Sequence, residues 1–284
     1  MRVRSFGSTG YRVPIIGQGT WRIDAAERAE AVATLRAGID AGMTHIDTAD
    51  MYGDGEAIVG EAILGEALQG LREEVFLVSK VVPSNATRRG VVRACEQSLG
   101  RLRTDRLDCY LLHWPGSHPL EETIAGFEDL RRDGKILSWG LSNFDVDDLD
   151  HALRIAGPYR IACNQVLYHL GERAIEHAVL PWCAHHGVAL VGYSPFGSGD
   201  FPYPDSPGGV VLARIAQAHA TTPRAVTLAF LTRFENTFTV PKTSRPERAI
   251  RNAEAGDLVL TGDEVAAIEA EFPRGPRPRT LPML

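Results

Sequence analysis

The sequence predicts an α/β protein built as a (β/α)8 barrel, the TIM-barrel architecture. Short apolar runs alternate with longer amphipathic stretches, eight such runs occur within 284 residues, and a polar or titratable residue closes almost every run. Near-continuous apolar character is typical of strands that are buried on both faces. The predicted strands are residues 15–19, 43–47, 75–80, 107–113, 136–142, 161–166, 188–193 and 237–240.

Flanking elements complete the predicted barrel. Residues 2–14 contain the turn signal Gly10-Tyr11, which predicts a β-hairpin before the first strand. Between the strands, apolar side chains recur at helical spacing, as Val32, Leu35 and Ile39 do in the first such stretch. The Pro- and Gly-rich residues 195–209 predict a long loop. Extra helices are expected after that loop and over 262–271, and residues 273–278 read as a tail.

We expect one domain over residues 1–284. The rival architecture is a doubly wound open sheet, which would carry a GxGxxG motif after an early strand. The nearest match, Gly17-Gln18-Gly19, lacks the third glycine. The barrel is therefore the favoured prediction.

Composition excludes several classes of function. Lys plus Arg number 30 against 36 Asp plus Glu, a net charge of −6 that is unlike a protein that tracks nucleic acid. No apolar run approaches the ~20 residues of a membrane span, and the first residues lack a secretory signal. His185-His186 is an isolated pair and HExxH is absent, so no metal site is predicted. We expect a cytoplasmic protein with four reduced thiols, Cys95, Cys109, Cys163 and Cys183.

Four titratable residues follow the predicted strands. Asp47, Lys80 and His113 close the second, third and fourth strands, and Tyr52 lies five residues after the first of these. Taken singly, each has an ordinary explanation, such as a turn cap, a solvated strand end or a buried packing residue. A barrel brings the carboxyl ends of its strands to one mouth, so together they predict an active site.

The four side chains suit the reduction of a carbonyl group. A phenol has an ordinary pKa near ~10, which is too high for an efficient proton donor at neutral pH. The Lys80 ammonium is expected to lower the pKa of Tyr52, Asp47 to hold Lys80, and a neutral His113 to hydrogen-bond the carbonyl oxygen. No residue of the set is an evident covalent nucleophile, so the chemistry requires a hydride donor.

At this point the chain resembles the aldo-keto reductases along nearly its whole length. Seven motifs occur in family order: IDTADMYG, VFLVSK, LLHWP, GLSNF, NQV-Y-H, GYSP and VPKTS. It is most similar to small bacterial reductases of methylglyoxal and other reactive aldehydes. The resemblance implies aldehyde detoxification that uses NADPH, with Tyr52 as the general acid and Asp47, Lys80 and His113 completing a catalytic tetrad.

The resemblance also implies how a nicotinamide cofactor is held. The nicotinamide carboxamide would be bound by Ser142, Asn143 and Gln165, and the ring would stack on Tyr193. The pyrophosphate would be contacted by Ser194 and Phe196. The adenosine 2′-phosphate and adenine would be held by Lys242, Thr243, Arg248 and Asn252. The substrate pocket would be lined by Trp21, Met51 and Trp114.

Some positions depart from the family pattern. Leu167 and Arg251 stand where many relatives have Glu, and for Arg251 this puts an adenine contact in doubt. Four cations fall within ten positions: Lys242, Arg245, Arg248 and Arg251. They form either a clamp for a phosphate group or a solvated basic face of the protein. The tail after Pro273 is short, which predicts an open pocket for small or varied carbonyls.

Two other functions compete with this prediction. Some members of the family are regulatory subunits of membrane channels, in which the bound cofactor acts as a sensor and turnover is slow or absent. A barrel isomerase or lyase without nicotinamide is the third reading, because the fold alone does not fix function. For the reductase, we expect a small-molecule carbonyl as partner and a monomer or weak oligomer as the assembly.

Overall fold

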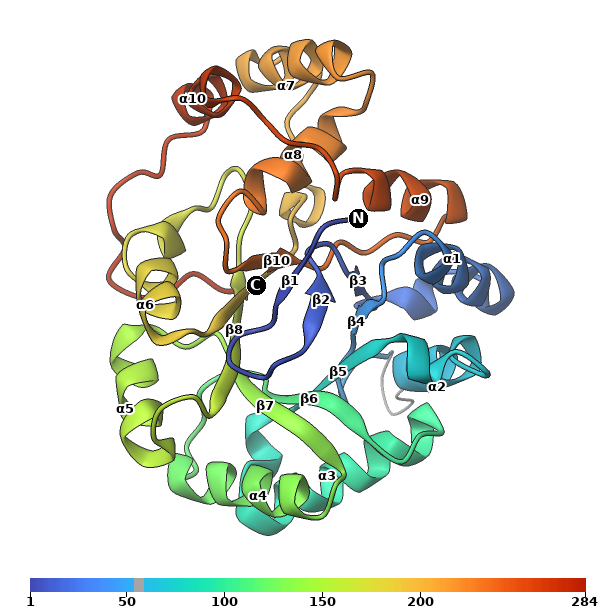
Figure 1. Cartoon of the computed structure of the whole chain (residues 1–284), viewed down its shortest axis with the longest axis vertical. Helices are drawn as coiled ribbons and strands as arrows, with labels where there is room; N and C mark the ends of the chain where they lie inside the picture. The colour runs from blue at the N-terminus through green and yellow to red at the C-terminus, as the bar shows by residue number, and fades with distance from the viewer. Residues whose placement is uncertain (54–58) are drawn as a thin grey trace.

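Eight parallel strands form a barrel at the centre of the computed structural model, which describes residues 1–53 and 59–284 (Figure 1). Their order around the barrel is the order of the chain, and the first strand meets the last through a parallel bridge between Ile16 and Thr239. The predicted fold class is confirmed. The strands are β3 (Gln18–Gly19), β4 (His45–Asp47), β5 (Phe76–Val81), β6 (Leu107–Leu112), β7 (Ile136–Ser142), β8 (Ile161–Leu167), β9 (Ala189–Tyr193) and β10 (Thr237–Thr239).

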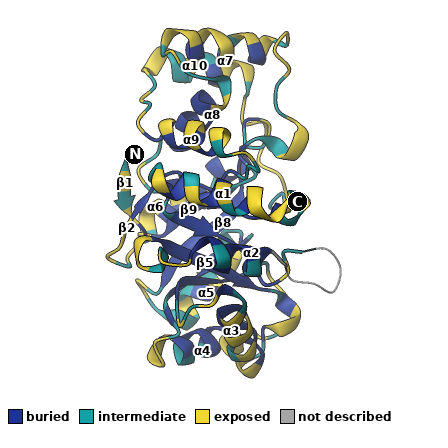
Figure 2. Ribbon diagram, turned by 90° about the vertical axis from the view of Figure 1, so that its right-hand side faces the viewer, coloured by how far each residue is buried: buried dark blue, intermediate teal, exposed yellow. Residues whose placement is uncertain are grey.

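An N-terminal hairpin covers one end of this barrel, as the sequence predicts. Strand β1 (Val3–Ser5) pairs antiparallel with β2 (Arg12–Pro14), and Val3 lies opposite Pro14. Figure 2 shows the hairpin and the C-terminus at opposite ends of the barrel. Phe6, which follows β1, packs on Phe76 at the start of β5, so the hairpin closes the amino ends of the strands. The carboxyl ends remain open on the other side.

Helices surround the barrel, and two of them are additional to the βα repeat. Helices α7 and α10 pack against each other away from the strands, where an extra pair is expected (Figures 1 and 2). The predicted loop 195–209 ends earlier than expected, because the Ser206 hydroxyl caps α7 by accepting from the Gly209 amide at 3.1 Å. The α-helices are α1 (Arg28–Asp40), α2 (Val59–Ala67), α3 (Arg88–Leu102), α4 (Leu120–Arg132), α5 (Val146–Ala156), α6 (Val179–His186), α7 (Pro207–Ala218), α8 (Pro223–Leu231), α9 (Pro246–Glu254) and α10 (Gly262–Glu271). The 3₁₀ turns are η1 (Ile23–Ala25), η2 (Arg72–Glu74), η3 (Pro83–Asn85), η4 (Ala174–Glu176) and η5 (Gly197–Gly199).

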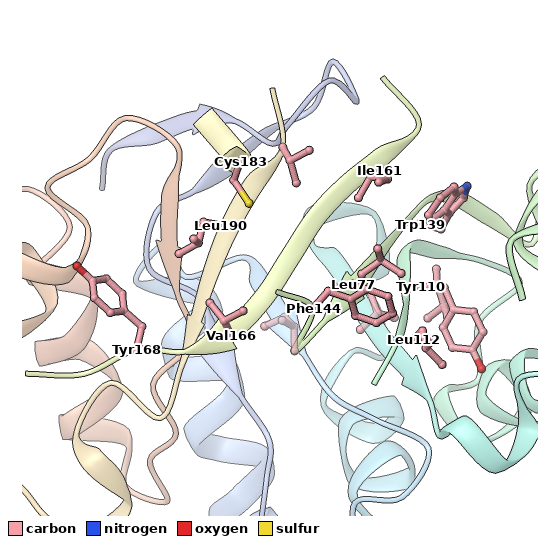
Figure 3. Close-up of a cluster of buried hydrophobic side chains, with 14 of the residues drawn as sticks. Leu77, Tyr110, Leu112, Trp139, Phe144, Ile161, Val166, Tyr168, Cys183 and Leu190 are labelled. Atoms are coloured by element: carbon pink, nitrogen blue, oxygen red, sulfur yellow. The ribbon is translucent and has the colours of Figure 1, made fainter. Parts of the chain in front are cut away.

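The strands divide their side chains between two cores. Figure 3 shows part of the cluster between strands and helices, including Tyr110 of β6 and Trp139 of β7. A second cluster holds the alternate residues of the strands together with the hairpin's Phe6. On β5, Leu77 belongs to the first cluster and Val78 to the second, as the two-residue period of a strand requires. Lys80 lies two residues after Val78, so its side chain is on the same face of β5 and points into the barrel.

An aromatic enclosure surrounds a histidine at the closed end of the barrel. The His45 ring is fully buried, with its centroid 5.5 Å from that of Phe6, 5.8 Å from Phe76 and 6.3 Å from Phe238. Neither ring nitrogen has a hydrogen-bond partner among the described residues. Burial lowers the pKa of His45 to about 4. This imidazole is therefore neutral at physiological pH.

All four cysteines are buried as free thiols, on α3, β6, β8 and α6: Cys95, Cys109, Cys163 and Cys183. Burial raises the pKa of Cys95 to about 12, and it also raises the pKa of Cys163 and Cys183 above their ordinary value.

Among the described residues, none of the helices is both long and apolar enough to span a bilayer.

Candidate active site

A buried ion pair stands at the carboxyl ends of β4 and β5. The Lys80 ammonium donates to Asp47 Oδ1 at 2.6 Å and to the Thr48 carbonyl at 2.8 Å. Its third contact is the Tyr52 hydroxyl at 3.4 Å, with the ammonium 5.1 Å from the centre of the Tyr52 ring. Lys80 has no exposed surface and Asp47 only 3%. Three of the four predicted catalytic residues thus form one contiguous cluster.

The charges in this cluster keep Lys80 protonated. Burial acts to lower the pKa of Lys80, but the negative charges of Asp47 and of the Tyr52 phenolate, with hydrogen bonds to both, raise it above its ordinary value. The pKa of Tyr52 is set by two opposing effects. Burial raises the pKa of the Tyr52 phenol, and the Lys80 ammonium opposes that rise without reversing it. Lys80 therefore lowers the pKa of Tyr52 as expected, but the net pKa lies above its ordinary value because desolvation of the phenolate outweighs the attraction of one ammonium.

His113 is the fourth predicted catalytic residue, and it faces Tyr52. The two rings meet edge to face with their centroids 5.8 Å apart. Burial, followed by the positive charge of Lys80, lowers the pKa of His113 to about 2. His113 is consequently a neutral imidazole at any physiological pH, as predicted, and can donate a hydrogen bond through one ring nitrogen.

A pocket of about 400 Å³ opens above this cluster. Asp47, Tyr52 and His113 line it, while Lys80 lies beneath its floor. Its wall also holds the three residues predicted to contact substrate, Trp21, Met51 and Trp114. Trp21 and Met51 are 39% and 48% exposed, so this side of the pocket is accessible to solvent.

The C-terminal tail reaches this pocket, which the sequence reasoning missed. Met283 and Leu284 line the wall, and the Leu284 amide donates to the Tyr193 hydroxyl at 3.4 Å. The tail begins at Phe272, whose carbonyl accepts from the buried Arg173 at 2.6 Å. The short tail therefore forms part of the pocket wall, while the side formed by Trp21 and Met51 is open to solvent.

Polar residues at the carboxyl ends of β7, β8 and β9 form another wall of the pocket. They are the four predicted nicotinamide contacts, Ser142, Asn143, Gln165 and Tyr193, and Ser194, which is predicted to contact the pyrophosphate. The Tyr193 hydroxyl donates to Asn143 Oδ1 at 3.0 Å. Asn143 has φ 62°, the left-handed region that asparagine tolerates better than most residues. The side-chain Nδ2 of Asn143 donates to the His113 carbonyl at 3.1 Å.

Gln165 connects this wall to the tetrad. Its Nε2 donates to Asp47 Oδ2 at 2.8 Å, so both carboxylate oxygens of Asp47 are engaged, one by Gln165 and one by Lys80. No local sequence pattern indicates this contact, because the two residues are 118 positions apart. It fixes the orientation of the carboxylate that holds the lysine.

A second, larger groove of about 830 Å³ adjoins the pocket, and Lys242 lines both. Its lining includes the other predicted cofactor contacts: Phe196, Thr243, Arg248 and Asn252. It also includes Arg245 and Arg251, and one cation that the sequence reasoning missed, Arg224 at the start of α8. A signal existed for Arg224, because a cation in the first turn of a helix opposes the helix dipole unless an anion is near.

The described residues hold no group of three His, Cys, Asp or Glu side chains arranged to bind a metal ion. Every residue predicted for the site lines the pocket or the groove, apart from Lys80 beneath them. The roles assigned to these residues stay predictions, while their proximity is a finding.

Comparison with known proteins agrees with this geometry. The model of the "Aldo/keto reductase family" matches residues 15–271. Over 92% of each chain, this sequence is 43% identical to methylglyoxal reductase YeaE of Escherichia coli, and it is 32% identical to glyoxal reductase of Bacillus subtilis over 96% of this chain and 95% of that one. A crystal structure of an aldo-keto reductase from Klebsiella pneumoniae in complex with NADPH superposes with a TM-score of 0.91 at 40% identity, with full coverage of both chains. The chain belongs to the aldo/keto reductase family.

Proposed function

We propose that this protein reduces small aldehydes and ketones to alcohols with NADPH, and that Tyr52 supplies the proton. The observation that carries the proposal is the Lys80 ammonium, buried between Asp47 and Tyr52 directly below an open pocket. A buried charge is costly unless it is paired, and here the pairing leaves the phenol at the pocket surface. That arrangement serves proton donation to a bound oxygen.

The residues present fit a dinucleotide phosphate cofactor. The groove next to the pocket carries five cations, and the pocket wall offers the amide of Asn143 and the ring of Tyr193. When bound, the nicotinamide would supply the hydride that the side chains lack. Lys242, Thr243, Arg248 and Asn252 would hold the adenosine end, and Ser142, Asn143, Gln165 and Tyr193 the nicotinamide end. Ser194 and Phe196 would lie along the pyrophosphate.

The side chains around the carbonyl group of the substrate would carry out the other steps of the reduction. His113 is neutral and would donate a hydrogen bond to the carbonyl oxygen, which orients the substrate and stabilises developing negative charge. Tyr52 would then transfer its proton to the same oxygen as the alcohol forms. Lys80 favours the phenolate that remains, because its ammonium stabilises the negative charge.

The walls of the pocket indicate small, weakly polar substrates. Trp21, Met51, Trp114, Met283 and Leu284 contribute apolar surface, and among the described residues Asp47 and Lys242 are the charged side chains that line the pocket. Such a site has nothing dedicated to a sugar's many hydroxyl groups, but suits short aldehydes and dicarbonyls. Since one relative is a methylglyoxal reductase, methylglyoxal heads the substrates to test.

The test is NADPH consumption at 340 nm with a panel of methylglyoxal, aromatic aldehydes, ketones and sugars. We expect turnover of the first two classes by the wild type, and a loss of ~10²–10⁴-fold in kcat for Tyr52→Phe with unchanged NADPH affinity. The matched control is Tyr159→Phe, which removes a phenol that is 76% exposed. Retention of more than about a tenth of kcat by Tyr52→Phe would show that another group donates the proton.

A further inference from the structure

An arginine from outside the predicted cofactor motif enters the nucleotide groove between two aromatic rings. The Arg224 guanidinium carbon lies 4.5 Å from the ring centre of Phe201 and 5.6 Å from that of Phe196. The two rings stand edge to face, 5.8 Å apart. All three side chains line the groove. The pair of rings thus holds this guanidinium against the loop that connects β9 to α7.

The groove around Arg224 is strongly cationic. Among the described residues, its lining holds five cations and no Asp or Glu: Arg224, Lys242, Arg245, Arg248 and Arg251. Within the described part of the chain, none of the five forms an ion pair, although arginines elsewhere on the surface do, such as Arg88 with Asp129. In a protein of net charge −6, this is a concentration of unneutralised positive charge.

Two helices also begin at this groove. The first residues of α8, Thr222 to Arg224, and those preceding α9, Ser244 and Arg245, belong to its lining. Helix N-termini carry partial positive charge, and Arg224 and Arg248 add full positive charge in the first turns of α8 and α9, where Glu247 of α9 is the one acidic residue. Such an arrangement is unfavourable in isolation. A bound polyanion would neutralise it.

We propose that Arg224 is a further cofactor-binding residue, which contacts a phosphate of the dinucleotide while Phe196 and Phe201 hold its guanidinium in place. This inference rests on the proposed use of NADPH. Stacking occupies the face of a guanidinium and leaves the N–H groups at its edge free for phosphate oxygens. The contact is with either the 2′-phosphate or the pyrophosphate, since both are anionic and the groove contains cations along its length.

The ordinary alternative is that Arg224 is a surface residue that only stabilises the loop by stacking. The two roles differ in what they predict. If Arg224 only anchors the loop, its removal would weaken the binding of every ligand of the groove equally. The weakening would be the same at all salt concentrations, because salt screens stacking only weakly. A phosphate contact contributes a charge–charge interaction, which weakens as salt rises.

The experiment measures the dissociation constants of NADPH and NADH by quenching of intrinsic fluorescence, at low and high salt. The variants are Arg224→Met, Arg224→Lys and, as a matched control, Arg93→Met, which removes an exposed arginine from the distant helix α3. We expect Arg224→Met to weaken NADPH at least ~10-fold and to reduce the salt dependence of binding. Arg224→Lys should restore the salt dependence and part of the affinity.

The two cofactors distinguish the two phosphates. If only NADPH weakens, Arg224 contacts the 2′-phosphate; if NADPH and NADH weaken alike with a reduced salt dependence, it contacts the pyrophosphate. Both results support the proposal. Weakening that is independent of salt, or a loss no larger than that of Arg93→Met, would overturn it.

Phe201→Leu tests the aromatic support separately. It should weaken NADPH several-fold in the wild-type background but have little further effect beside Arg224→Met, because the two residues act through one contact. Additive losses would contradict the coupling. Failure of the proposed function is recognised independently: a wild type that binds NADPH but reduces no carbonyl refutes the reductase assignment alone, and one that binds no NADPH refutes both.

Discussion

The buried histidine at the closed end of the barrel should make the protein sensitive to acid, and His45→Leu should relieve that sensitivity. In the folded protein the pKa of His45 is about 4, against an ordinary value of 6.5 in the unfolded chain. Below pH 6.5 the unfolded state therefore binds a proton that the folded state does not. Stability from this residue is present at neutral pH and is lost as the pH falls toward 4.

The size of the effect follows from the two pKa values. A difference of 2.5 pKa units corresponds to ~3.4 kcal/mol once the pH is well below 4. Between pH 7 and pH 5 the loss is about 2 kcal/mol, because the unfolded histidine is almost fully protonated at pH 5 and the folded one is not. Such a loss is a sizeable part of a typical net stability of ~5–15 kcal/mol.

Urea unfolding at pH 7, 6 and 5, followed by tryptophan fluorescence, measures this directly. The stability of His45→Leu relative to wild type should rise by about 2 kcal/mol from pH 7 to pH 5, whatever the packing cost of the substitution at pH 7. The exposed His185, replaced by Leu, controls for the loss of one imidazole. A difference that does not change with pH would refute the reasoning, since packing alone has no such dependence.

Three further predictions concern the site. Lys80→Met should lower kcat at pH 7 by ~10²-fold or more without comparable loss of NADPH affinity. The reason is that no ammonium would then oppose the burial that raises the pKa of Tyr52. A defect confined to the KM for NADPH would argue against this explanation. Gly60→Ala should lower kcat by about tenfold or more, since an added Cβ would lie 2.9 Å from the Tyr52 carbonyl oxygen and 3.1 Å from its Cβ. The control is Gly100→Ala in α3, where the new methyl group meets nothing within 4 Å; equal activity of both variants would contradict the prediction. The wild type should prefer NADPH over NADH by at least ~10²-fold in kcat/KM. Arg248→Met should reduce this preference by lowering kcat/KM for NADPH while barely changing kcat/KM for NADH. Equal use of both cofactors by the wild type would show that the basic segment is only a solvated surface.

The catalytic cluster was predictable because its geometry follows from the fold. Asp47, Lys80 and His113 close three consecutive parallel strands, and the barrel places those ends together. Strand boundaries were less accurate at the seam, where the expected 15–19 strand is reduced to Gln18–Gly19. There Ile15 and Gly17 exchange backbone hydrogen bonds with Thr239 of β10, which makes an isolated bridge at Ile16 and no regular ladder.

The rest of the site depends on contacts between distant parts of the chain. Arg224 lies in an ordinary helical stretch, and only tertiary packing brings it beside the segment that contains Arg248. Leu284 ends a tail without periodic pattern, and its position on Tyr193 depends on anchors such as Arg173. The net pKa of Tyr52 was not predictable for a related reason, because the extent of burial cannot be read from neighbouring residues in sequence.

The four buried thiols have a consequence for an enzyme of this kind. A cysteine thiolate attacks electrophilic carbonyls, so the fraction of thiolate and its accessibility set the rate of damage. Here all four cysteine sulfurs are buried, and the raised pKa values of Cys95, Cys163 and Cys183 suppress the thiolate at physiological pH. The folded protein is therefore chemically resistant at cysteine to the reactive aldehydes it is proposed to consume.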